Sequence, residues 1–480
     1  MKFRLLSIIM FLGLACFAKG EGRVQSATWA SIAPYQSATC SIPALHPLYT
    51  CSLYAPLGSS ISDGVDEASI GGDIKSDGES LVVKDSIWKE SIKTVSLTRN
   101  GIELSEPIIN LGSEDKLVIR FDDLSEQPEN YRYRIRHCDA NWRLDGLDPF
   151  EYIDGFEEGA IDNWQFSFTT LQNYIYYYQT IPAQYTTFQA SGNYALEIFV
   201  QDDPEDVILT WRFRVVENLF DIQTAISRPI VNIGGTTTHQ EIDVSLHNKS
   251  SYSIADPSHY LRVDIQQNRR TDQIHTIPYS GYSDGDYTFR WNPENVFAGG
   301  NTFRYFDVSN IRTPMYNIQK IERFGDRFYA FIRPDEDRSN KVYSYHPALF
   351  GGMKVNVWDR TDVNIEADYV WVNFSLPMPY PYMNGNIYIV GALTQWQLND
   401  NSRLEWLPQY KTYTKRMLLK QGYYAYQYVF VPVGEKEGLT ATLEGDHIET
   451  PNQYNIYVYL RQPTDRYDRL VGATQTTFEW

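Results

Sequence analysis

The chain has 480 residues, of which 15% are aromatic, and 60 acidic against 42 basic side chains give it a net charge of -18 at pH 7. That charge disfavours nucleic acid as a partner, because phosphates would be repelled. The length suits about three domains of ordinary size. Thirty-six tyrosines, and short alternating segments between Gly, Pro, Asn and Asp clusters, predict an all-β protein.

The first residues have the pattern of an export signal. Basic residues precede an apolar run from Leu5 to Ala15, and small residues suited to cleavage follow it. We therefore expect residues 1–20 to be a Sec-type signal peptide that sends the mature chain beyond the inner membrane. Lipidation of Cys16 is an open alternative. The remaining sequence has no run of about 18 apolar residues, so it predicts no membrane-spanning helix.

Residues 21–90 are rich in Ser, Gly, Ala and Asp and show little periodicity, which predicts a flexible leader. Cys40 and Cys51 lie in this segment and could form a disulfide in an oxidising compartment. Cys138 would then be the odd thiol, and we expect it to be buried.

Residues 91–217 are predicted to form an immunoglobulin-like β-sandwich. The segment contains about seven short alternating strands between turn residues, which suits that architecture. The strand over 131–138 alternates strictly, so its tyrosines and isoleucine share the core face. The opposite face carries a stripe of arginines, namely Arg132, Arg134 and Arg136.

The end of this strand carries His137, Asp139 and Trp142, residue types that could serve metal or acid–base chemistry. Adjacent residues on an extended strand project in opposite directions and cannot converge on one ion. We therefore interpret these three residues as a structural corner, held by hydrogen bonds and packing.

Residues 218–375 are predicted to form a middle β domain. The GxSxG match at 281–285 falls in a predicted hairpin and not on a strand-to-helix turn, so we do not interpret Ser283 as a nucleophile. The acidic segment that starts at Asp335 lacks the Gly and Glu of a calcium loop and is interpreted as a solvated loop. The sequence thus predicts no catalytic, cofactor-binding or metal-binding residues and no enzyme activity.

Residues 376–480 are predicted to form a third sandwich. A strand ending at Gly391, a following Trp396 and a downstream Gly-Tyr-Tyr strand look like the early-set sandwich of glycogen-binding modules. Trp396 and Trp406 could stack on sugar rings, but they could equally be core or protein-contact residues, which is the interpretation we favour.

Several segments, in this order along the chain, resemble the plug protein family of the type IX secretion system. They are Phe121 to Leu124, the Tyr131 to Trp142 corner, Glu151 to Phe156, Ser191 to Tyr194, Arg212 to Val215 and Phe303 to Asp307. The resemblance implies a periplasmic, non-enzymatic protein associated with the inner face of the outer membrane. It would bind the periplasmic mouth of a giant outer-membrane β-barrel translocon and close it at rest. Its contact with the membrane would be only through that partner, and it would use no cofactor and no small-molecule substrate.

The tyrosine run from Tyr174 to Tyr178 places aromatic residues on both faces of a strand. At least one of them should therefore meet solvent or a partner. With the resemblance in view, the candidate partner-contact residues are Arg132, Arg134, Arg136, Tyr174, Tyr176, Tyr177, Tyr178 and Trp396.

Two other functions remain open from the sequence. The third domain could make the chain a glycan-binding accessory protein of the envelope. The chain could also itself be an outer-membrane β-barrel, because alternating strands abound and the ending with Phe478 and Trp480 resembles the terminal signal of such barrels.

Overall fold

The computed structural model describes residues 82–230, 235–250, 254–346 and 349–479. These residues belong to one compact unit, Glu67–Trp480. The expected signal peptide, Cys16 and the Cys40–Cys51 pair lie outside the described residues.

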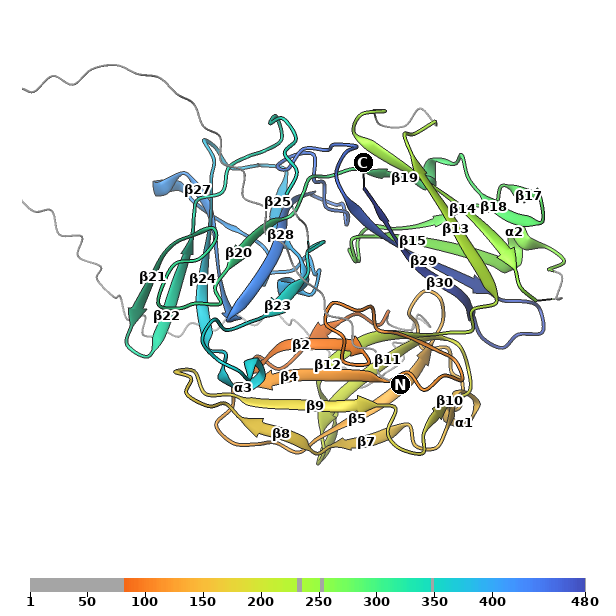
Figure 1. The fold of residues 1–480 in the computed structure, drawn as a ribbon, viewed down its shortest axis with the longest axis horizontal. Helices are drawn as coiled ribbons and strands as arrows, with labels where there is room; N and C mark the ends of the chain where they lie inside the picture. Colours follow the sequence, from red (N-terminus) through yellow and green to blue (C-terminus); the bar gives the residue numbers. More distant parts are fainter. Residues whose placement is uncertain (1–81, 231–234, 251–253, 347–348, 480) are drawn as a thin grey trace, which may run out of the picture. The chain divides into compact units, whose positions relative to one another are not determined.

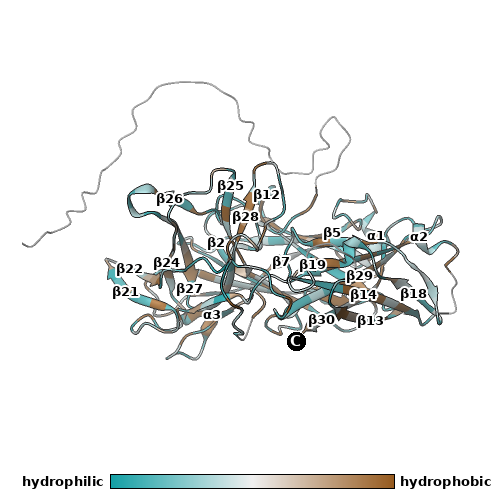
Figure 2. Cartoon of the chain, turned by 90° about the horizontal axis from the view of Figure 1, so that it is seen from above, coloured by the Kyte–Doolittle hydropathy of each residue, from teal (hydrophilic) through white to brown (hydrophobic). Residues whose placement is uncertain are grey.

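The described chain is nearly all β, as the sequence predicts, and hydrophobic and hydrophilic residues mix along its strands (Figure 2). The helical elements are single turns: α1 (Pro149–Tyr152), α2 (Pro257–Tyr260), α3 (Val363–Glu366), η1 (Pro293–Asn295), η2 (Ala392–Thr394) and η3 (Pro408–Tyr410). In the part of the chain that the structure describes, no helix has the length and apolar character needed to cross a bilayer.

The first sandwich contains β1 (Ser86–Ile87), β2 (Ile92–Arg99), β3 (Ile108–Asn110), β4 (Leu117–Asp123), β5 (Tyr131–Cys138), β6 (Ile153–Asp154), β7 (Glu158–Ile161), β8 (Asn163–Phe166), β9 (Ile175–Ile181), β10 (Thr187–Phe188), β11 (Gly192–Val200) and β12 (Asp203–Val216). One sheet has the order β1-β12-β11-β5-β7 with β3 beside β12, the other has the order β2-β4-β9-β8, and β10 pairs with β6. The alternating face of β5 lies in the core between the sheets.

The first sheet begins inside the predicted leader. Ser86 and Ile87 pair with Thr210 and Leu209, and the carboxylate of Asp85 binds the Arg212 guanidinium at 3.1 Å. The alternation of two residues is too short to be detected from sequence, so this strand could not be predicted.

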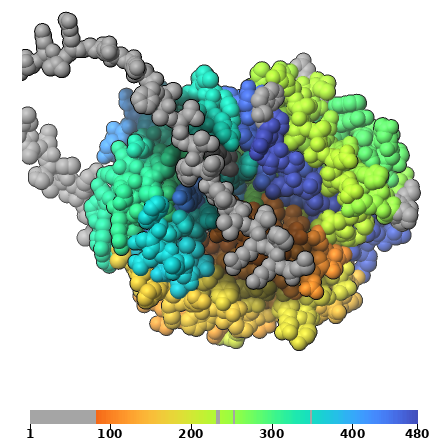
Figure 3. All heavy atoms as spheres, viewed as in Figure 1, coloured from red at the N-terminus to blue at the C-terminus, as the bar shows by residue number. Residues whose placement is uncertain are grey.

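The second sandwich contains β13 (Phe220–Ser227), β14 (His239–Asn248), β15 (Leu261–Gln267), β16 (Ile274–Ile277), β17 (Gly281–Ser283), β18 (Asp286–Phe289), β19 (Val296–Ala298), β29 (Asn452–Leu460) and β30 (Arg469–Phe478). Its sheets have the orders β13-β14-β18-β17, with β19 beside β14, and β16-β15-β29-β30. Figure 1 shows the blue strands β29 and β30 beside the green strands, and blue atoms adjoin lime-green atoms in Figure 3.

The third sandwich contains β20 (Arg304–Asp307), β21 (Ile318–Phe324), β22 (Arg327–Ile332), β23 (Met353–Val355), β24 (Tyr369–Pro377), β25 (Gly385–Val390), β26 (Glu405–Leu407), β27 (Thr412–Lys420) and β28 (Gly422–Pro432). Its sheets have the orders β20-β28-β23, with β25 beside β28, and β21-β22-β24-β27-β26. Its core is separate from the other two cores.

Strand pairing crosses the predicted division between 218–375 and 376–480. β29 pairs with β15 from Leu261 to Gln267 and buries Ile456 and Val458 in the second core. The third sandwich is therefore an insertion between β19 and β29. Alternation within a strand reveals its buried face but not its distant partner, so this return of the chain could not be predicted.

Candidate functional site

The arginine stripe on β5 is half-buried and matched by acids of its own sheet. Arg134 and Arg136 lie 2.7 Å and 3.4 Å from the Glu197 carboxylate, and Arg132 lies 3.9 Å from Glu158. The stripe thus presents a largely neutralised surface.

The tyrosine run on β9 is mostly internal. Tyr177 lies in the first core and stacks on Phe121 with ring centroids 5.1 Å apart. Tyr174 and Tyr176 are also buried, but they pack against Tyr369 of the third sandwich. Burial therefore removes Tyr174, Tyr176 and Tyr177 from the candidate partner surface, whereas Tyr178 stays half-buried. The aromatic residues on the second face of β9 meet another part of the same chain.

A buried ion pair lies beside these tyrosines and joins the first sandwich to the third. The Lys420 ammonium at the end of β27 lies 2.7 Å from the Asp122 carboxylate on β4, and each side chain is 2% exposed. The Tyr369 hydroxyl donates to the same carboxylate at 2.6 Å. Burial raises the pKa of Asp122 and lowers the pKa of Lys420, while their mutual attraction opposes both shifts.

A second carboxylate strengthens the same junction. The backbone amides of Leu171 and Gln172 donate to Asp368 at 2.7 Å and 3.0 Å. The Tyr174 hydroxyl donates to the Ala367 carbonyl at 2.9 Å. The loop before β9 is thereby held by the segment before β24.

The structure places His137 at the end of β5, and Asp139 and Trp142 in the turn that follows it. The His137 ring nitrogens lie 2.6 Å from Asp145 and 3.1 Å from the Ser191 carbonyl oxygen. Asp139 accepts from two backbone amides of the turn, those of residues 141 and 143, at 2.8 Å each. Trp142 is buried beside arginine side chains. These contacts are structural, and Cys138 beside them is a buried free thiol, as expected.

This corner also contacts the second sandwich. The Arg214 guanidinium lies 4.7 Å from the Trp142 ring centroid and 3.6 Å from that of Tyr457. The Tyr459 hydroxyl donates to Asn193 at 2.9 Å. Tyr457 and Tyr459 belong to β29, so the returning strands form part of the contact with the first sandwich.

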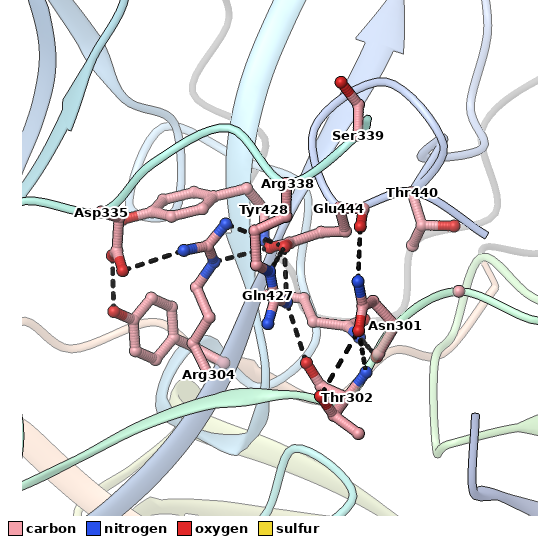
Figure 4. A network of polar contacts seen from close by, with 12 residues as sticks. Asn301, Thr302, Arg304, Asp335, Arg338, Ser339, Gln427, Tyr428, Thr440 and Glu444 are labelled. Carbon is pink, nitrogen blue, oxygen red and sulfur yellow. Dashed lines mark hydrogen bonds and ion pairs between the residues drawn. The ribbon is translucent and has the colours of Figure 1, made fainter. Parts of the chain in front are cut away.

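The third sandwich contains a buried ionic network (Figure 4). Arg304 lies 2.9 Å from Glu444 and 3.0 Å from Asp335, and Arg338 lies 2.6 Å from Glu444. Burial alone would raise the pKa of Glu444, but the two guanidinium groups have the larger combined effect, so the net result is a pKa below the ordinary value. Asp335 itself is only 8% exposed, and its charge is compensated inside the protein, whereas the residues that follow it as far as His346 form a largely exposed loop, as the sequence predicts.

The two tryptophans that could have stacked on sugar rings, Trp396 and Trp406, do not form an open platform. Trp396 is 9% exposed, packs edge-on against Phe303, and lines a cavity of about 180 Å³ that Trp142 and Arg212 also line. Trp406 is half-buried and packs against Tyr413. Burial therefore also removes Trp396 from the candidate partner surface.

Two motif matches have ordinary structural settings. Ser283 lies in the β17–β18 hairpin, and its hydroxyl donates to Asp284 at 3.0 Å. Across the described ranges, no three His, Cys, Asp or Glu side chains are grouped so that they could hold a metal ion.

Sequence reasoning missed Asp122, Lys420 and Asp368. Asp122 falls on the polar face of β4 and Lys420 ends an amphipathic strand, so each has the pattern of a solvated residue. Their partners lie far away along the chain, and no local signal could have identified the pair.

Comparison with known proteins gives two informative matches. The family described as "Type 9 secretion system plug protein 1st domain" matches residues 92–217. The crystal structure of a hypothetical protein from Parabacteroides merdae is similar over 83% of this chain and 100% of its own, with 31% identity and a TM-score of 0.80. Native E. coli alpha-2-macroglobulin is 8% identical, over 84% of this chain and 24% of its own, and its TM-score of 0.17 carries no argument. No curated protein matches the sequence.

Proposed function

The chain belongs to the type 9 secretion system plug protein family, and from that premise we propose that it closes the periplasmic mouth of the system's outer-membrane translocon at rest. The match of residues 92–217 to the plug domain is the observation that carries the proposal. In this proposal the mature chain is periplasmic, lies at the inner face of the outer membrane, and acts without catalysis or a cofactor.

The way the sandwiches are joined supports a closing role. A barrel wide enough for folded cargo would pass small solutes, so its plug must resist deformation while it blocks the opening. The buried Asp122–Lys420 pair joins the first and third sandwiches, and Arg214 joins the first and second. Breaking such buried polar contacts is costly, so they favour one fixed arrangement over several.

The surface also suits a reversible partner. An interface of about 1,200–2,000 Å² is typical of specific complexes that can still dissociate. Exposed aromatic side chains, which are enriched in such interfaces, occur on the first sandwich at Phe150, Phe156, Trp164 and Tyr185. Contact through these residues would need no rearrangement of the core.

Purification of the tagged full-length chain from cell envelopes tests the proposal. We expect a large outer-membrane barrel protein to be recovered with it in near-stoichiometric amount. A matched control uses the same tag on an unrelated periplasmic protein. Recovery of the chain alone, under conditions in which the barrel itself stays intact, would contradict the proposal.

A further inference from the structure

The edge strand β8 of the first sandwich is unprotected. It ends the sheet order β2-β4-β9-β8, its four residues are all exposed, and its sequence Asn-Trp-Gln-Phe carries no charge. Edge strands of monomeric proteins are usually kept very short, as β8 is, or blocked by charges, prolines, bulges or covering segments, and β8 itself carries no charge, proline or bulge. The opposite edge, β2, has such protection, with Lys93, Arg99 and an irregular register after Lys93.

Aromatic side chains extend along this edge. Trp164, Phe166 and Phe168 are 41%, 55% and 61% exposed, and the rings of Trp164 and Phe166 pack edge to face with centroids 5.3 Å apart. Trp164 and Phe166 pair with Tyr177 and Ile175, so their side chains lie on the core-facing side of the sheet. They continue the apolar face of β9 into solvent, which is typical of a site that a partner covers.

The position of β8 indicates how a partner would bind. The strand pairs with β9 on one side, and its other side has no strand among the described residues. An extended peptide could pair with the free backbone groups there, while alternate side chains of the peptide cover the aromatic rings. Because β9 is fixed by the first core, such pairing would extend the existing sheet without refolding it.

The charges around β8 specify the chemistry of this peptide. Asp162 immediately precedes the strand, and Glu129 lies in the loop whose backbone amide donates to Tyr177, the pairing partner of Trp164. These two carboxylates form no ion pair with any other described residue, so they leave an acidic border that favours Lys or Arg in the partner.

A second copy of the chain suits this edge poorly. Each copy has a net charge of -18 and would bring the same acidic border to the contact. Repulsion between like charges therefore opposes edge-to-edge pairing of two copies.

We propose that β8 receives an extended segment of the outer-membrane translocon, with apolar residues over Trp164 and Phe166 and flanking Lys or Arg beside the acidic border. This inference rests on the proposed function and assigns the contact within it. The added strand would position the first sandwich at the barrel mouth through backbone hydrogen bonds, which are directional and can be broken one by one when the plug is released.

Site-specific photo-crosslinking in intact envelopes tests this assignment. A photoreactive phenylalanine analogue replaces Phe166 in the full-length chain and, as the matched control, Trp291, which is equally 55% exposed on the second sandwich. We expect position 166 to crosslink to a barrel peptide that carries Lys or Arg, and position 291 to give no barrel adduct. A crosslink from position 166 to another copy of this chain, or no adduct while the barrel still co-purifies, would overturn the assignment.

Substitution of the aromatic residues gives a second readout. The double variant W164E/F166E changes only exposed side chains, so its urea unfolding midpoint should match that of the native chain. We expect the amount of barrel that co-purifies with W164E/F166E to fall at least about tenfold, because aromatic residues at the centre of an interface contribute most of its binding energy. Trp291→Glu should retain as much barrel as the native chain. Equal retention by W164E/F166E would refute the β8 assignment, whereas failure of the native chain to retain the barrel would refute the proposed function instead.

Discussion

Replacing Lys420 by methionine tests the junction between the first and third sandwiches. The substitution keeps an unbranched apolar side chain, shorter by the terminal ammonium, but leaves the Asp122 carboxylate buried without its cation. Each partner is 2% exposed and their charged atoms are 2.7 Å apart, so the pair is desolvated. Removing one partner of such a pair typically costs about 3–5 kcal/mol in the free energy of unfolding.

The surroundings place the expected loss near the lower end of that range. The Tyr369 hydroxyl still donates to Asp122 at 2.6 Å and stabilises part of the remaining charge. We therefore expect about 3 kcal/mol for Lys420→Met. Asp122→Asn should cost a similar amount, although the ammonium keeps the Asn364 carbonyl at 2.7 Å and the Tyr174 ring at 4.1 Å.

The double variant D122N/K420M completes the cycle. With both charges removed, neither side chain leaves a buried charge without a partner. The double variant should therefore lose about 2–3 kcal/mol less in the free energy of unfolding than the sum of the two single variants. Urea unfolding followed by both circular dichroism and tryptophan fluorescence measures all four proteins. Single losses below about 1 kcal/mol that add without coupling would show that solvent reaches the pair, and would refute the reasoning.

Three further outcomes follow from buried groups. Arg304 and Arg338 hold the pKa of Glu444 below its ordinary value, so the unfolded chain binds more protons than the folded chain in acid. The resulting stabilisation is complete above about pH 5 and is lost as the pH falls through the pKa of Glu444 in the folded chain. Urea unfolding midpoints should therefore decrease between about pH 6 and 3, and midpoints that do not change with pH would contradict this. Burial raises the pKa of the Cys138 thiol, so mass spectrometry should find its peptide alkylated by iodoacetamide only after unfolding, and rapid native labelling would contradict its burial. Trp396→Ala should cost about 3–5 kcal/mol in urea unfolding, and a loss below about 1 kcal/mol would mean that the ring is not packed.

Local alternation was enough to predict the longer strands of the first sandwich, although not short ones such as β1. The predicted strand over 131–138 is β5, with its tyrosines and isoleucine in the core and its arginines half-buried. The period of two directly reports which face is buried, and the all-β class follows from many such segments.

Pairing between distant segments could not be predicted in the same way. β29 resembles any other amphipathic strand, and only its pairing with β15 returns it to the second sandwich. The contact between Asp122 and Lys420 spans most of the described chain, so neither residue has a local signature. The sequence predicted that at least one tyrosine of the 174–178 run meets solvent or a partner, but it could not show that Tyr369 of the same chain packs against Tyr174 and Tyr176.

The permeability of the outer membrane tests the closing role most directly. Cells that lack this chain but keep the translocon should admit a hydrophilic solute too large for ordinary porins, and the native chain supplied in trans should restore the barrier. An outer membrane that stays equally tight without the chain, with the translocon present at its normal level, would contradict the account.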